Sequence, residues 1–129
     1  MVALITVEAC VDSVASAVQA ERGGAHRVEL CDNLADGGTT PSHGVLVAAV
    51  QALRIPVFPI IRLRGGSFIY DADEIAIMTA DVAHARECGV HGVVIGALTP
   101  EGDVDEAAVL AWKEAAGGLP LTFHRAWDV

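Results

Sequence analysis

Short β-rich runs alternate with longer helical stretches along most of the chain. This alternation predicts parallel βαβ units rather than a helical bundle or a β-sandwich. Five runs have the length and residue types of strands, and they cover Leu4 to Cys10, Arg27 to Cys31, Val57 to Arg62, Gly92 to Ile95 and Leu121 to His124.

Four helices are predicted between these strands, because each stretch has a polar residue at its start and a helix-ending residue, in most cases glycine, after it. The expected starts and ends are Asp12 and Gly23-Gly24, Ser42 and Leu53, Asp71 or Asp73 and Cys88-Gly89, and Asp103 or Asp105 and Gly117-Gly118. The expected fold is therefore α/β.

A weak internal repeat makes this prediction more specific. The run GGAHRVEL at residues 23–30 is echoed by CGVHGVVI at 88–95, and GGTTP at 37–41 by GALTP at 96–100. Each repeat contains two βα units, and eight units would form a (β/α)8 barrel of the TIM-barrel type, with about 250 residues. We expect residues 1–129 to form a single partial barrel domain. We favour a fragment of a longer reading frame over the alternative, a homo-oligomer in which two copies pair their exposed barrel edges.

Charge and composition exclude several classes of partner. The chain has 129 residues, with 17 acidic and 8 basic side chains and a formal net charge of −9. Such a chain repels phosphate backbones and anionic lipid, so neither nucleic acid nor a membrane is expected as a partner. The sequence begins without a signal-peptide pattern, and its three widely spaced cysteines are typical of thiols in a reducing compartment. We therefore expect a cytoplasmic protein.

The polar residues of the first two strands fall on one face of each strand, since side chains alternate along a strand. These sets are Thr6, Glu8 and Cys10 on the first strand, and Arg27, Glu29 and Cys31 on the second. The opposite faces are apolar and suit the helical layer, so the polar sets should point into the barrel interior.

Barrel sites form at the carboxyl ends of the strands, and several polar residues fall there. They are Cys10, Cys31, Arg62, Arg64, Thr122, His124, Arg125 and Asp128. Together with Glu8 and Glu29 they predict a mouth lined by two thiols, two carboxylates, arginines and a histidine.

Each of these groups has more than one interpretation. Glu8 and Glu29 could form an ion-pair layer with Arg27 and Arg62, or one glutamate could act as a general base with a pKa raised by burial. His124 could be a general acid, a general base, a metal ligand or a hydrogen-bonded structural residue.

Arg62 and Arg64 could clamp a carboxylate or phosphate, or instead pair with Asp71 or Asp73. The glycine pair Gly37-Gly38 is similar to a phosphate cradle but lacks the lysine of a P-loop, and turn geometry explains it equally well.

The remaining cysteine and histidines are expected outside the site. We interpret Cys88 as a small apolar packing residue at a helix end. His26 and His91 lie in loops that enter strands, at the opposite rim, while His43 and His84 lie on helices.

Five segments in this order and spacing resemble the CutC family, which is named for copper homeostasis. They are VEACVDSVASA, GGAHRVELCDNLADGGTTPSHG, IPVFPIIRLRGGSFIY, GVVIGALTPEGDVD and LTFHRAWDV. The chain departs from the family pattern at His26 and His91, where relatives usually have aspartate, and at Leu63, where proline is common.

The resemblance implies a (β/α)8 barrel that binds copper, as Cu(I), through Cys10 and Cys31. Thiolates are soft ligands that favour Cu(I), so the chemistry is compatible. A second hypothesis is an enzyme that acts on a small anionic metabolite. In it, Arg62, Arg64 and Arg125 would bind the substrate, and Glu8, Glu29 or His124 would move a proton.

Overall fold

The computed structural model describes residues 4–129 and shows an α/β fold with five parallel strands. The strands are β1 (Glu8–Val11), β2 (Arg27–Leu30), β3 (Val57–Pro59), β4 (Val93–Ile95) and β5 (Leu121–Phe123). β1, β2 and β3 pair in sequence order, as do β4 and β5. A parallel bridge between Ile60 and Val94 connects β3 to β4, so all five strands follow each other in the order of a barrel wall.

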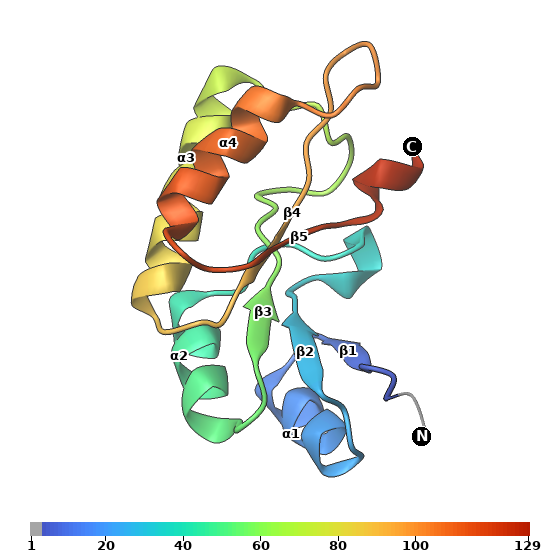
Figure 1. Cartoon of the computed structure of the whole chain (residues 1–129), viewed down its shortest axis with the longest axis vertical. Coiled ribbons are helices and arrows are strands. Elements are labelled where there is room, and N and C mark those ends of the chain that lie inside the picture. The colour runs from blue at the N-terminus through green and yellow to red at the C-terminus, as the bar shows by residue number, and fades with distance from the viewer. Residues whose placement is uncertain (1–3) are drawn as a thin grey trace.

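The four predicted helices are present as α1 (Val14–Arg22), α2 (His43–Ala52), α3 (Ala72–Glu87) and α4 (Glu106–Ala116). α2, α3 and α4 lie along one side of the strands (Figure 1). Two short 3-10 helices, Leu34–Asp36 and Arg125–Asp128, follow β2 and β5. Within residues 4–129, no helix has both the length and the apolar character needed to cross a membrane.

Side chains cap the helices much as the sequence predicts. Ser42 caps α2, Asp105 caps α4, and Asp71 caps α3 in a capping box with Glu74. The first helix differs by one residue, because the Ser13 hydroxyl, not the side chain of Asp12, accepts the hydrogen bond from the Ser16 amide. A hydroxyl and a carboxylate serve equally well at this position, so the sequence did not distinguish them.

The sheet has two different faces, as the alternating pattern predicts. Val28, Leu30 and Val93 belong to the main core, which they share with helix residues such as the fully buried Trp112. Residues of the opposite face form a smaller buried cluster of their own: Cys31, Phe58, Ile60 and Val94. This second cluster is the inner surface of the barrel wall.

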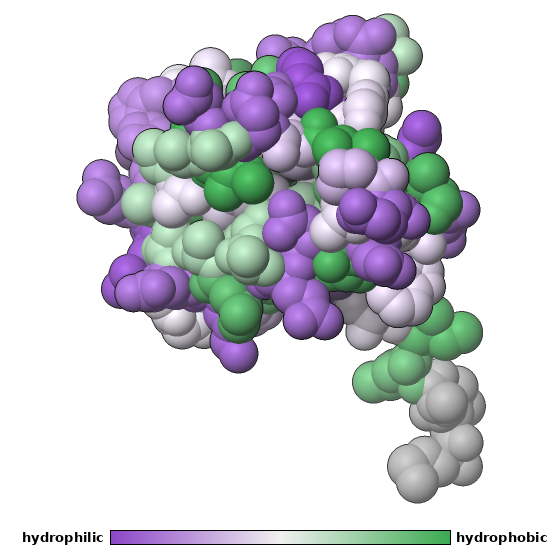
Figure 2. Space-filling view, turned by 90° about the horizontal axis from the view of Figure 1, so that it is seen from above, coloured by the Kyte–Doolittle hydropathy of each residue, from purple (hydrophilic) through white to green (hydrophobic). Residues whose placement is uncertain are grey.

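The first strand is shorter than predicted. β1 begins at Glu8, which pairs with Arg27 at the start of β2, and the described residues before it have no ladder partner. Leu4 and Ile5 are 95% and 78% exposed, and an apolar arm projects from the body of the molecule (Figure 2). Thr6 therefore lies outside the strand and the site.

The third strand also ends early, at Pro59, because the chain changes its partner there. The amide of Ile60 donates to Leu30 in β2, whereas the amide of Ile61 donates to Val94 in β4. This change of partner brings the two halves of the wall together and directs the following loop across the strand ends.

Candidate functional site

A cavity of about 390 Å³ lies at the carboxyl ends of the strands, where the sequence predicts the site. Its walls come from β1, β2, β4 and β5 and from the segments that follow β2, β3 and β5. The lining residues are Cys10, Glu29, Leu34, Gly37, Ile60, Arg62, Phe68, Val94, Thr122, His124 and Arg125.

Cys10 and Cys31 face each other across neighbouring strands. Parallel pairing places Cys10 beside Glu29. Cys31 is two residues after Glu29 and directly follows the end of β2. The two Sγ atoms are 3.8 Å apart, and Cys31 Sγ lies 3.8 Å from Glu29 Oε1. Cys31 is only 2% exposed, whereas Cys10 is open to the cavity and solvent. A buried thiol and an accessible thiol thus lie next to each other in the barrel wall.

This arrangement favours the protonated forms of all three groups. Burial, followed by the nearby charges of Cys10 and Glu29, raises the pKa of the Cys31 thiol. Burial and Glu29 likewise raise the pKa of Cys10, and burial and Glu8 raise that of Glu29. A cation bound here would replace thiol protons and neutralise part of this like-charge repulsion.

The predicted four-residue ion-pair layer is only half present. Arg27 forms an ion pair with Glu8 at 2.5 Å, and its guanidinium lies 4.4 Å from the centre of the Phe58 ring. Glu29 and Arg62 take no part in this pair: Glu29 contacts Cys31, and Arg62 binds backbone carbonyls. The parallel register sets Glu29 beside Phe58, so Arg62, four residues further along the chain, is not its neighbour in the sheet.

Arg62 fixes the loops around the cavity. It is 4% exposed and donates hydrogen bonds to the carbonyls of Asp36, Gly38 and Gly66. Its Nε has no hydrogen-bond partner within the described chain. Arg62 is therefore mainly a structural cross-link between the loops that surround the cavity.

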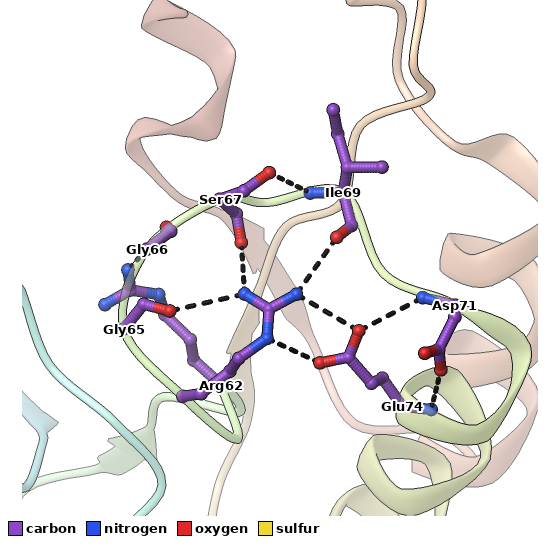
Figure 3. Close-up of polar contacts among 8 residues, drawn as sticks. Arg62, Gly65, Gly66, Ser67, Ile69, Asp71 and Glu74 are labelled. Carbon is purple, nitrogen blue, oxygen red and sulfur yellow. Dashed lines mark hydrogen bonds and ion pairs between the residues drawn. The ribbon is translucent and has the colours of Figure 1, made fainter.

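Arg64 is not part of the cavity, which corrects the prediction of a two-arginine clamp. It forms an ion pair with Glu74 and donates to the carbonyls of Gly65, Ser67 and Ile69 (Figure 3). The predicted alternative partners, Asp71 and Asp73, do not pair with it either. The capping box of α3 holds Glu74 in the position where Arg64 reaches it.

His124 lies where β5 ends, and its ring is held in a neutral form. Its Nδ1 accepts a hydrogen bond from the Ala126 amide, so in the neutral ring Nε2 carries the proton. Within residues 4–129, buried Nε2 has no partner. Burial, together with the charges of Arg62 and Arg125, lowers the pKa of His124 to about 4. At neutral pH the residue is therefore a hydrogen-bond donor rather than a cation.

The close packing of this ring depends on Gly96. A Cβ atom at Gly96 would lie 2.3 Å from His124 Cε1, so only glycine leaves room for the ring. On the other side, the ring centre is 5.1 Å from that of Phe68. Neither Gly96 nor Phe68 has a polar side chain, so reasoning from residue types did not include them in the site.

The remaining candidates divide between the cavity and the surface. Thr122 and Arg125 line the cavity, whereas Asp128 is exposed and lies outside it. Gly37 and Gly38 have positive φ angles, and their amides donate to Leu34 and Asn33. These amides are used within the turn, which supports the turn interpretation over a phosphate cradle.

Comparison with known proteins gives a consistent result. The sequence profile of the CutC family matches residues 5–129. The human copper homeostasis protein cutC homolog is 52% identical over 123 residues, covering 95% of this chain and 45% of its own length. The family protein CutC of Chromobacterium violaceum is 50% identical, covering 95% and 50%. The chain thus spans about half the length of these curated relatives.

A solved structure agrees with the fold. The crystal structure of CutC from Streptococcus agalactiae superposes with a TM-score of 0.92 at 41% sequence identity, covering 97% of this chain and 61% of that one. The partial barrel, the paired cysteines and these matches lead to one conclusion: the chain belongs to the CutC family.

Proposed function

We propose that this chain binds copper as Cu(I) through Cys10 and Cys31 and serves copper homeostasis in the cytoplasm. The observation that carries the proposal is the 3.8 Å separation of the two sulfur atoms. With metal–sulfur bonds of about 2.3 Å, as in zinc thiolates, this separation corresponds to an angle of about 110° at the ion. Two thiolates could therefore bind one ion with little movement.

The donor set matches the ion. Thiolates are soft ligands that select Cu(I) over harder cations, and reduced thiols suit a reducing compartment. Glu29 offers a third donor, since one of its oxygens and both sulfur atoms lie within 4.8 Å of one another. Phe58, Ile60 and Val94 cluster with Cys31 and shield its sulfur from water.

Anaerobic titration with Cu(I) against a chromophoric chelator tests this proposal. The unmodified chain should bind one equivalent with loss of two titratable thiols. Cys10→Ser and Cys31→Ser should each weaken binding by about 100-fold or more, because either change leaves a single soft ligand. Cys88→Ser is the matched control and should retain this equivalent. Binding of one equivalent with unchanged affinity by the Cys10→Ser, Cys31→Ser double variant made in the Cys88→Ser background would overturn the proposal.

A second candidate function is binding of a small anionic metabolite in the same cavity. The observation that favours it is His124 Nε2, a buried donor without a partner in the described chain, on a residue that lines the cavity. Arg62 and Arg125 line the same cavity and add positive charge near His124. A carboxylate or phosphate would satisfy this donor and be attracted by these charges.

Thermal-shift measurements with inorganic phosphate and small carboxylates distinguish the two functions. If the cavity binds anions, one of these probes should raise the melting temperature, and His124→Asn should abolish that rise. Cys10→Ser should leave the rise intact. A rise that persists in His124→Asn, or no rise with any probe, would count against anion binding.

A further inference from the structure

A second group of metal-binding side chains lies outside the cavity, on the helical layer. His43 is the first residue of α2, and His84 and Cys88 lie one turn apart at the end of α3. The lower end of α3 lies beside α2 in Figure 1. Three potential metal ligands from two helices therefore lie together, although neither helix alone supplies all three.

The donor atoms of these residues face one another. His43 Nδ1 is 3.0 Å from His84 Nε2, and Cys88 Sγ is 3.6 Å from the former and 3.4 Å from the latter. Zinc bonds of about 2.05 Å to nitrogen and 2.3 Å to sulfur at tetrahedral angles give edges of about 3.4 Å between nitrogens and 3.6 Å between nitrogen and sulfur. The observed triangle differs from these edges by a few tenths of an ångström.

The contact between the two imidazoles is itself informative. Two ring nitrogens at 3.0 Å can share one proton, so at least one of them directs a lone pair toward the other. A metal ion would replace that shared proton and use both lone pairs. Because His43 and His84 are exposed and Cys88 is partly buried, an ion can enter from solvent.

The surroundings favour a cation as well. His43, His84 and Asp81 line a surface hollow of about 520 Å³, so a carboxylate lies on the same hollow as the two imidazoles. Burial raises the pKa of Asp81, and the nearby His84 opposes this shift. Two nitrogens and one thiolate form a borderline-soft donor set, which suits Zn²⁺ and leaves its fourth position for water.

We propose that His43, His84 and Cys88 form a second metal site in this chain, for a divalent ion of borderline softness such as Zn²⁺. The site is separate from Cys10 and Cys31, and it does not depend on copper binding there. Its position on the outer surface, with an open coordination position, makes it a site of readily exchangeable metal.

Co²⁺ is a suitable probe, because tetrahedral cobalt with a thiolate ligand has a strong, distinctive absorption spectrum. The experiment uses the full chain with Cys10→Ser and Cys31→Ser, so that Cys88 is the single thiol. One equivalent of Co²⁺ should give the tetrahedral thiolate spectrum, and one equivalent of Zn²⁺ should remove it.

Three further variants test the ligands. Cys88→Ser should abolish the thiolate band, and His43→Ala and His84→Ala should each weaken Co²⁺ and Zn²⁺ binding by at least about 10-fold. Glu87→Gln is the matched control, since this exposed neighbour is not a ligand. Circular dichroism verifies that each variant is folded.

The outcomes are distinct. A spectrum that needs Cys88 and both histidines supports the site. No thiolate spectrum at one equivalent, or one that survives in His43→Ala and His84→Ala, overturns it. Because the test is made without Cys10 and Cys31, failure of the copper proposal leaves this result unaffected.

Discussion

Lowering the pH from 7 to 5 is expected to destabilise the fold through His124. This histidine has a pKa of about 4 in the folded chain, compared with an ordinary value of 6.5. Between these two values the unfolded chain binds a proton at His124 and the folded chain does not. Stability therefore falls as the pH falls through this window, since protonation favours the unfolded state.

The size of the effect follows from the two pKa values. Linkage gives a slope that approaches about 1.4 kcal/mol per pH unit within the window. Integrated from pH 7 to pH 5, the contribution of His124 amounts to about 2 kcal/mol. The physical cause is the burial of the ring, together with the positive charges of Arg62 and Arg125, which a protonated His124 would face.

Urea unfolding between pH 7.5 and pH 4.5 measures this effect, with His124→Asn as the matched variant. Asparagine can still accept the amide of Ala126 as a helix cap, but it does not titrate. Other groups also titrate here, and Glu29 and Asp81, whose pKa values are raised, act in the opposite direction. The difference between the two proteins removes these shared contributions.

The stability advantage of the unmodified chain over His124→Asn should shrink by about 2 kcal/mol between pH 7 and pH 5. If the two stability curves run parallel across this range, the reasoning is wrong. The ring would then be solvated or already charged in the folded chain, and its role as a neutral donor in the cavity would fail with it.

Three further changes test the packing and the helix ends by urea unfolding at neutral pH. Gly96→Ala should cost about 1–3 kcal/mol because its new Cβ meets the His124 ring, whereas Gly118→Ala, with open space around it, should cost far less. Trp112→Ala should cost about 3–5 kcal/mol, since the ring is fully buried between the helices and the sheet. Asp71→Ala should cost about 1 kcal/mol and shorten α3 at its start, which circular dichroism would report as lost helix.

The sequence predicts the paired thiols because their placement depends on local rules. Side chains alternate along a strand, and consecutive strands of a βαβ unit pair in parallel. Cys10 and Cys31 each lie at the carboxyl end of a strand on the polar face, so the two rules together bring them to one point. The helix ends are predictable for the same reason, since a cap and its hydrogen-bond partner lie within one turn of each other.

The arginines show where such reasoning stops. Arg62 is bound by carbonyls of Asp36, Gly38 and Gly66, and carbonyls are present at every residue. No residue type in the sequence marks these acceptors. Arg64 instead meets Glu74, whose position depends on how the α3 capping box is oriented after a loop.

The cluster of His43, His84 and Cys88 was missed for a related reason. The spacing of His84 and Cys88 is one helical turn, which could have indicated two ligands on one helix face. His43 belongs to another helix, however, and its place beside them depends on where the end of α3 lies relative to the start of α2. That relative position is set by the packing of each helix on the sheet, which periodicity alone does not describe.

The two proposals for the cavity use different residues. Cys10 and Glu29 belong to β1 and β2, Cys31 directly follows β2, and these three groups favour a cation, whereas Arg62 and His124 follow β3 and β5 and favour an anion. A Cu(I) ion bound by two thiolates carries a net negative charge, so it gains from the positive charge of the arginines that line the same cavity. Variants at the thiols should therefore weaken copper binding alone, and variants at His124 should weaken anion binding alone. If both sets of variants removed both ligands equally, the cavity would be a single site, and the division drawn from its charges would be wrong.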